Sequence, residues 1–137
     1  MTEEFYYDTS IWIDFYEKRG KNGESAFKLI EKVIREELKI VHSNHNIEEL
    51  KAVGYSQDEI NDFLSIVKPN LTRKILKTNS QVEEAKKLSR ERNVSRGDAL
   101  HAIISRDNDL QLIARDRDFD FLKDISRAKL PEDFTED

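Results

Sequence analysis

The chain has 137 residues and no cysteine, and its 28 acidic and 23 basic residues give a net charge of −5 at pH 7. The absence of cysteine excludes disulfides, thiol catalysis and cysteine-ligated metal centres. It is consistent with the cytoplasmic location that we expect. The negative charge argues against a protein that passively coats nucleic acid, since such a protein must neutralise phosphates. No run of 18 apolar residues suggests a membrane span.

The length fits one domain over residues 1–137, with the last few residues frayed. The elements predicted in the first half are a buried strand at 5–7, a helix at 11–18, an amphipathic helix over 26–38, a short strand at 39–42 and a helix at 46–53. Thr9 or Ser10 would cap the first helix, and Gly54 would end the last.

The second half continues the alternation of strands and helices. Its predicted elements are a helical stripe at 60–67, a charged helix over 82–93, a helix from Ser95 to 104, a strand at 110–114, a turn or short helix at 116–122 and an edge strand over 130–137. Residues 71–76 fit either a short strand or an irregular link. Strands that alternate with helices predict an α/β fold, with a mainly parallel sheet covered by helices on both faces.

Acidic residues follow the predicted strands. Asp8 comes directly after the first strand, Glu49 lies in the helix after the second, and Asp116 follows the strand at 110–114. Asp98 lies at a helix start. Ligands of open α/β sheets gather at the carboxyl ends of the strands, so this topology would bring the four acids together.

Clustered carboxylates repel one another and attract a cation. Hard oxygen ligands suit Mg²⁺ or Mn²⁺. One or two such ions could hold a phosphodiester and lower the pKa of an attacking water. The sequence therefore favours an oxygen-only metal site.

Each acid also has a purely structural interpretation. Capping would explain all four: an Asx turn or helix cap at Asp8, capping boxes at Asn46–Glu49 and Ser95–Asp98, and a cap at Asp116. Taken singly, each acid is better explained by capping than by catalysis. The functional interpretation depends on all four acids standing at strand ends together.

Nearby side chains receive more modest roles. Glu48 should point away from Glu49, Asp118 should be solvated or capping, and Asp14 should be exposed. His101 shares a helix face with Asp98, and we expect it to pack near the site or to bond a carboxylate rather than to act as a base. His42 and His45 show no ligand spacing.

Candidate substrate contacts surround the acids. Guanidinium groups pair well with phosphate, and Arg115 and Arg117 rank first because they flank Asp116, ahead of Arg96 and Arg73. Thr9 and Ser10 beside Asp8 are further candidates. Solvated surface charge explains the arginines at least as well.

The segments DTSIWIDF, SNHNIEEL, GDALHA and ARDRDF, in this order and spacing, resemble the four motifs of PIN-domain ribonucleases, and most closely those of VapC-like toxins of toxin–antitoxin pairs. The resemblance implies a three-layer α/β/α sandwich and Mg²⁺- or Mn²⁺-dependent cleavage of RNA. Asp8, Glu49, Asp98 and Asp116 match the family's catalytic, metal-binding acids, with Asp8 and Asp98 in first rank. An antitoxin partner and a homodimer are also implied.

One position departs from the family pattern. Ala114 stands where a Thr or Ser is common, two residues before the last acid, so a hydroxyl that could orient a ligand or water is missing. An endoribonuclease is the leading hypothesis. The alternatives are a catalytically weak or inactive PIN-like module that binds RNA or protein, and a nuclease that acts on DNA or a structured flap.

Overall fold

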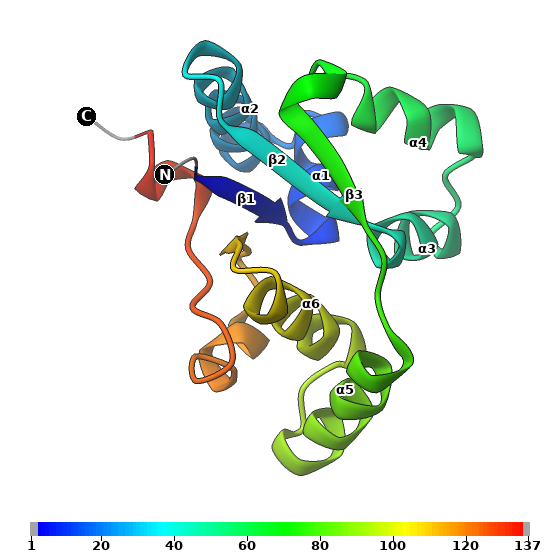
Figure 1. Ribbon diagram of the computed structural model, residues 1–137. Coiled ribbons are helices and arrows are strands. Elements are labelled where there is room, and N and C mark those ends of the chain that lie inside the picture. The colour runs from blue at the N-terminus through cyan, green and yellow to red at the C-terminus, as the bar shows by residue number, and fades with distance from the viewer. Residues whose placement is uncertain (1–2, 136–137) are drawn as a thin grey trace.

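The computed structural model describes residues 3–135. These residues contain one parallel sheet, with strands in the order β3-β2-β1-β4 (Figure 1). The strands are β1 (Glu4–Tyr7), β2 (Lys39–Ser43), β3 (Thr72–Ile75) and β4 (Gln111–Ile113). Tyr6 pairs with Val41 of β2 on one side and with Leu112 of β4 on the other. The parallel sheet is confirmed, and the ambiguous residues 71–76 contain its third strand.

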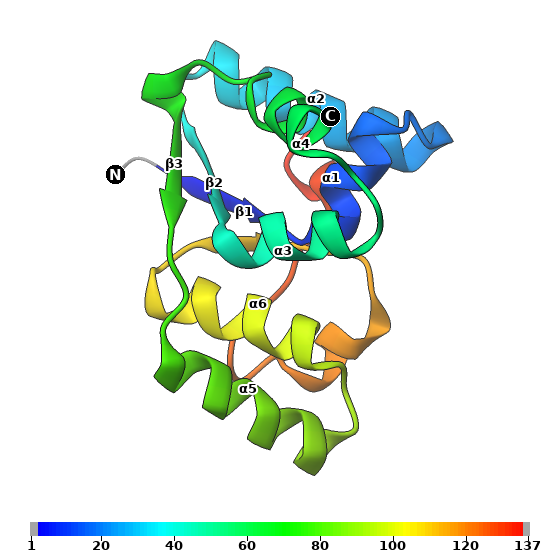
Figure 2. The ribbon, with the colours of Figure 1, turned by 90° about the vertical axis from the view of Figure 1, so that its right-hand side faces the viewer.

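Helices cover both faces of the sheet. In Figure 2, α2 and α4 lie above the strands, and α5 and α6 lie below. Residues of α1 and α3 pack in the same apolar core as those of α2 and α4. The helices are α1 (Thr9–Tyr16), α2 (Gly20–Arg35), α3 (Asn44–Ala52), α4 (Gln57–Leu64), α5 (Asn79–Arg92) and α6 (Arg96–Asp107), with 3₁₀ turns η1 (Pro69–Leu71), η2 (Arg117–Phe121) and η3 (Pro131–Asp133). The expected three-layer α/β/α sandwich is confirmed.

Successive residues of β1 enter different cores, because side chains alternate across a strand. Phe5 and Tyr7 pack with α1 and α2, whereas Tyr6 packs with α6 on the other face. All three side chains are completely buried. Burial on both faces is typical of a parallel strand between helical layers.

The tail differs from its prediction. An edge strand over 130–137 is wrong for the described part, because η3 follows a single bridge between Lys129 and Ile113. Pro131 has no N–H for a ladder and fixes its own φ. Phe134 then packs edge-on against Phe5, with ring centroids 5.0 Å apart. Residues 136–137 of this prediction lie outside the described residues.

Two helices have N-cap residues that differ from the prediction. Asp8, rather than Thr9 or Ser10, is the N-cap residue of α1. Ser43 is the N-cap of α3, and Asn46 completes its capping box. The predicted box between Asn46 and Glu49 is therefore wrong, and the Glu49 carboxylate has no capping role.

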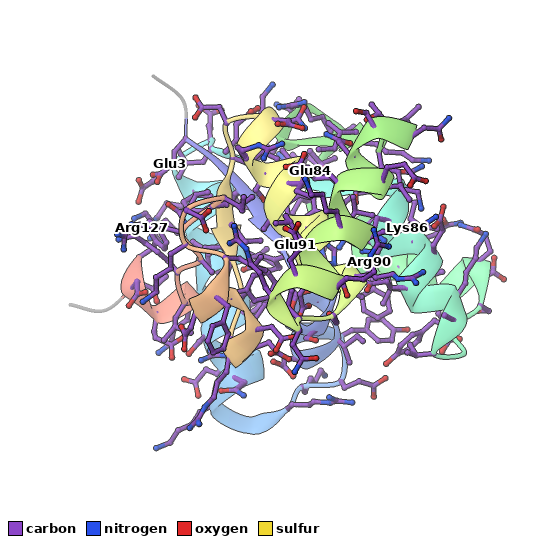
Figure 3. The ribbon with its side chains drawn as sticks, turned by 90° about the horizontal axis from the view of Figure 1, so that it is seen from below. Glu3, Glu84, Lys86, Arg90, Glu91 and Arg127 are labelled. Atoms are coloured by element: carbon purple, nitrogen blue, oxygen red, sulfur yellow. The ribbon has the colours of Figure 1, made fainter. Side chains whose placement is uncertain are left out.

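Charged side chains cover the outer surface of α5. Figure 3 shows Glu84, Lys86, Arg90 and Glu91 there, and Glu84 pairs with Arg106 of α6 at 2.8 Å.

The predicted exposure of Asp14 is wrong, because this residue of α1 is only 9% exposed and lies 3.8 Å from Arg19. Among residues 3–135, no helix has both the length and the apolar character needed to cross a membrane.

Candidate active site

The candidate site lies at the carboxyl edge of the sheet, beyond the end of β1. The chain runs from β1 through β2 to β3 on one side of β1, and the next connection crosses to β4 on the other side. The edge between β1 and β4 is therefore the switch point where α/β sheets bind ligands. Asp8 follows β1, Glu49 projects from α3, Asp98 lies in the first turn of α6, and Asp116 is the N-cap of η2. The four predicted acids therefore meet at one edge.

Glu49 is enclosed by hydrogen-bond donors. Its Oε1 accepts from Thr9 Oγ1 at 2.6 Å and from His101 Nε2 at 2.7 Å. Thr9 Oγ1 in turn accepts from Asn46 Nδ2 at 2.9 Å. His45 Nε2 lies 3.5 Å from Glu49 Oε2. Oε1 is thus committed to protein groups, whereas Oε2 accepts no hydrogen bond from residues 3–135. Thr9 is buried and bonded to Glu49, so it does not stand open to substrate.

The two histidines beside Glu49 act as donors and not as metal ligands. His101 Nε2 faces only oxygens, those of Glu49, Asp8 and Thr9, the latter two at 3.3 Å. A ring nitrogen in such surroundings carries hydrogen. His45 Nε2 lies 3.2 Å from the carbonyl of Gly97, which also requires an N–H. His45, Glu49 and His101 come close enough to suggest a metal site, but these nitrogens offer no lone pair to an ion.

Gly97 makes room for Glu49. A Cβ at this position would lie 2.5 Å from Glu49 Oε2 and 3.7 Å from His45 Nε2. A side chain at position 97 would therefore displace the carboxylate. Sequence reasoning missed both His45 and Gly97, because neither shows its role without the packing of α3 on α6.

A second group of acids is more open. Oxygens of Asp98, Asp116 and Asp118 lie within 4.8 Å of one another. Ser95 caps α6 by accepting from Asp98 N, but its own N–H donates to Asp118 Oδ2 at 3.0 Å, so Asp98 does not complete the predicted capping box. Asp116 does cap η2, accepting from Asp118 N at 2.8 Å. Asp118, expected to be solvated or capping, caps α6 from within this cluster.

The pKa values distinguish these acids. Burial raises the pKa of Asp8 to about 6, and the charges of Glu49 and Asp116 act in the same direction. Burial, together with the charges of Asp8 and Asp116, raises the pKa of Asp98 to about 7. Burial also acts to raise the pKa of Glu49, but bonding and charge from His101 outweigh it and lower that pKa to about 2. Asp8 and Asp98 are therefore the carboxylates that a bound cation would stabilise most.

This donor set fits a hard divalent cation. Mg²⁺ and Mn²⁺ take carboxylate oxygens, and repulsion among Asp8, Asp98 and Asp116 is what an ion would relieve. Asp8 occupies an N-cap position, yet its side chain makes no capping hydrogen bond. Capping alone therefore does not account for Asp8.

The predicted arginine contacts differ in availability. Arg115 makes a bidentate pair with Glu132, at 2.9 and 2.6 Å, and Arg73 pairs with Glu4. Arg117 and Ser10 are exposed. A polar cavity of about 460 Å³ adjoins Asp116, and its basic lining residues are Arg115, Lys123, Arg127 and Lys129.

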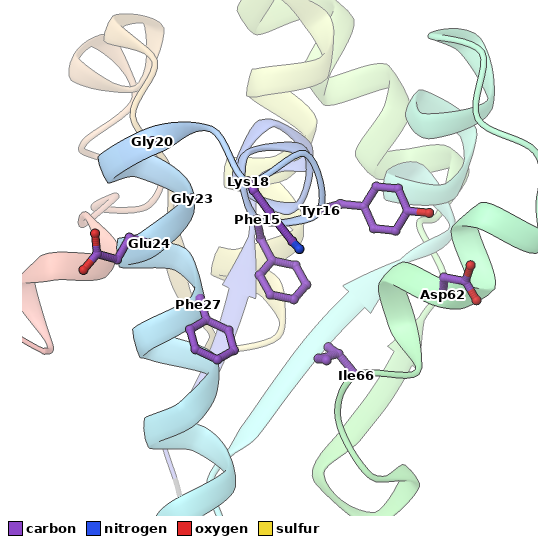
Figure 4. A pocket seen from close by; sticks show the side chains of 9 residues that line it. All are labelled: Phe15, Tyr16, Lys18, Gly20, Gly23, Glu24, Phe27, Asp62 and Ile66. Carbon is purple, nitrogen blue, oxygen red and sulfur yellow. The ribbon is translucent and has the colours of Figure 1, made fainter.

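An apolar hollow of about 630 Å³ lies among α1, α2 and the end of α4 (Figure 4). None of the four acids of the candidate site lines it. Phe15 and Phe27 stack along its wall, with ring centroids 6.2 Å apart. Phe27 and Ile66 are each more than 40% exposed. Exposed apolar patches of this kind often mark surfaces that bind another molecule.

Fold and site together define an α/β domain with a carboxylate cluster at the switch point of a parallel sheet. The family model for the PIN domain matches residues 5–124, so the chain belongs to the PIN domain family. The nuclease family indicated by the sequence motifs is thereby confirmed, and the four motifs lie inside the matched region.

Solved structures share the fold. A chain of VapBC2 from Rickettsia felis, bound to a DNA fragment from their promoter, is similar with a TM-score of 0.65 and 17% identity, covering 93% of this chain and 96% of that one. VapC20 of Mycobacterium tuberculosis, a toxin that cleaves the sarcin-ricin loop, has a TM-score of 0.62 and 20% identity, covering 88% of this chain and 94% of that one. PAE2754 from Pyrobaculum aerophilum is similar with a TM-score of 0.58 and 20% identity, covering 98% of this chain and 96% of that one. Among curated proteins, none matches the chain.

Proposed function

We propose that this protein is a Mg²⁺- or Mn²⁺-dependent endoribonuclease, the toxin of a VapC-like toxin–antitoxin pair. The observation that carries the proposal is the meeting of Asp8, Asp98 and Asp116 at the sheet edge, with the pKa values of Asp8 and Asp98 raised by burial and mutual repulsion. Membership of a nuclease family and the fold shared with VapC20 support RNA as the substrate.

The chain's own residues divide the work. Asp8, Asp98 and Asp116 would hold the ion, with Asp118 beside them and Glu49 behind them. A bound divalent ion supplies Lewis-acid polarisation of the phosphodiester and a lowered pKa for an attacking water. Arg117, which is exposed next to Asp116, would orient the RNA by contacting a phosphate.

Cleavage of RNA with Mg²⁺ or Mn²⁺ tests this proposal. Asp98→Asn should remove activity because the amide keeps the size of the side chain but not its charge. Asp58→Asn is the matched control, since Asp58 also lies in the first turn of a helix but is exposed on α4. Equal cleavage by the Asp98 and Asp58 variants, or no cleavage by the wild type, would contradict the proposal. A parallel panel of DNA and flap substrates decides the substrate class.

An inhibitory antitoxin is the proposed partner, and a homodimer is the proposed assembly. The co-crystallised VapBC2 pair supports the first, and the apolar hollow offers exposed Phe27 and Ile66 as contacts. Co-expression with the product of a neighbouring small reading frame should give a complex that no longer cleaves RNA. Phe27→Asp should weaken that complex and leave cleavage by the free protein unchanged.

A binding module without cleavage is the second candidate. Ala114 favours it, because this buried residue lacks the hydroxyl common at its position. Calorimetric titration with Mn²⁺ separates the two functions. A site filled below millimolar ion favours the nuclease, and its absence favours the binding module.

A further inference from the structure

A buried chain of hydrogen bonds connects the end of β2 to Glu49. Ser43 Oγ lies 2.7 Å from the Tyr6 hydroxyl, which lies 2.8 Å from His101 Nδ1. His101 Nε2 continues the chain to Glu49 Oε1 at 2.7 Å. Ser43, Tyr6 and His101 are completely buried. Buried polar atoms depend on protein partners, so each link fixes the next.

Tyr6 determines how the His101 ring is held. Because Nε2 carries hydrogen, a neutral ring accepts the Tyr6 O–H at Nδ1, and a charged ring donates its Nδ1–H to the Tyr6 oxygen. Either arrangement keeps the same ring orientation. The opposite neutral tautomer would turn a lone pair toward Glu49, and the Tyr6 contact gives it no compensating advantage.

The His101 N–H lies between two carboxylates from different elements. It is 2.7 Å from Glu49 of α3 and 3.3 Å from Asp8, which follows β1. The position of this ring therefore influences the separation of Asp8 and Glu49. Asp8 is one of the acids that would hold the ion, so the buried chain extends to the edge of the proposed metal site.

We propose that Tyr6 and His101 are positioning residues, which together hold Glu49 and Asp8 in the arrangement that ion binding requires. This inference rests on the proposed function for its effect on cleavage. Removing a residue that orients the ligands of a metal typically lowers metal affinity or activity about 10- to 100-fold. Tyr6 acts only through His101, and its effect should fall at the lower end of this range.

Adjacent tyrosines provide a matched test. Tyr6→Phe removes the hydroxyl that contacts His101, whereas Tyr7→Phe removes an equally buried hydroxyl that donates to the Ala26 carbonyl on the opposite face. Tyr6→Phe should weaken Mn²⁺ binding about 10-fold and lower kcat with little change in KM for RNA. Tyr7→Phe should leave all three values near those of the wild type. Thermal melting of both variants shows whether a loss of ion binding or turnover comes only from a loss of stability.

Substitutions at His101 separate a hydrogen-bond role from a packing role. Gln can place an N–H near the position of Nε2, whereas Met has a similar size and offers none. His101→Gln should retain more Mn²⁺ affinity and turnover than His101→Met. Equal losses in the Gln and Met variants, or equal effects of Tyr6→Phe and Tyr7→Phe, would overturn the inference.

A third measurement is independent of both ion and RNA. Nitrogen NMR of the ion-free protein should show hydrogen on His101 Nε2, and Tyr6→Phe should change the Nδ1 signal while Tyr7→Phe does not. A hydrogen on Nδ1 alone in the wild type would overturn the inference even if cleavage is observed. If the wild type fails to cleave RNA, the proposed function fails, and this measurement still decides the role of Tyr6 and His101.

Discussion

The acids of this site occupy two different environments. Glu49 accepts hydrogen bonds from Thr9 and His101, and its pKa is lowered to about 2. Asp8 is buried and Asp98 is half-buried, both among like charges, and their pKa values are raised to about 6 and 7. One carboxylate is thus stabilised as an anion by the protein itself, whereas the other two need an outside cation. Similar residues at one sheet edge can therefore have opposite electrostatic roles.

The largest contrast should come from changing each carboxylate to an amide. Asp8→Asn should lower turnover by more than the roughly 10- to 100-fold typical of an outer partner. It should also stabilise the ion-free protein at pH 8 by on the order of 3 kcal/mol, because a shift of about two pKa units no longer opposes folding. Glu49→Gln should instead destabilise it, since His101 and Thr9 lose their anionic acceptor. Urea unfolding in EDTA measures both, and changes of the same sign would refute the contrast.

The pH dependence of stability follows from the same pKa values. Above the ordinary value of 3.8, the unfolded chain has released the protons of Asp8 and Asp98 while the folded state still holds them. These two carboxyls should therefore lower the stability of the ion-free protein as pH rises from about 4 to 7. Buried His42 and His45 act in the opposite direction over much of this range, because burial lowers their pKa values to about 4. The difference in stability between the wild type and Asp8→Asn isolates the contribution of Asp8, which should fall by about 3 kcal/mol over this range. Glu49 acts oppositely, because its contribution is lost as pH falls through about 2.

Mn²⁺ is the control for this pH effect. Saturating ion should restore much of the stability at pH 8 and little at pH 5, because the carboxylates must be ionised to bind it. Unfolding curves at both pH values with and without Mn²⁺ measure this. A difference in stability between the wild type and Asp8→Asn in EDTA that is the same at pH 5 and pH 8 would contradict the raised pKa of Asp8.

A smaller effect should come from Gly97→Ala. The new Cβ would lie 2.5 Å from Glu49 Oε2 and should push the carboxylate away from His101, lowering turnover about 10-fold as for other outer partners. The control is the same change in a Glu49→Ala background, where no carboxylate is left to displace. Turnover should then be insensitive to Gly97→Ala, and a further 10-fold loss in that background would point to a different cause.

The smallest effects concern the arginines beside Asp116. Arg117→Ala should weaken RNA binding and reduce the salt dependence of log K by about one charge, as for a single phosphate contact. Arg115→Ala should mainly lower thermal stability, because Glu132 loses its bidentate partner. Binding at several salt concentrations, with melting curves, separates the two. A larger salt effect for Arg115 would reverse this assignment.

The sequence by itself determined which acids stand at strand ends, and the periodicity of its apolar residues determined the layered α/β fold. These features are local, since a strand, a cap and a following acid lie within a few residues of one another. The prediction for α3 failed on local competition: Ser43, at the end of β2, took the cap that Asn46 was expected to provide. The tail prediction failed because Pro131 and Phe134 favour packing on a face over pairing at an edge.

Only the tertiary structure decided how the acids differ from one another. Glu49 and His101 are 52 residues apart, and Tyr6 and His101 are 95 apart, so no spacing rule connects them. Their contact requires the helices on both faces of the sheet to meet beyond the carboxyl end of β1. Burial and donor direction then fix the charge of each group, and these depend on neighbours that the linear order does not specify.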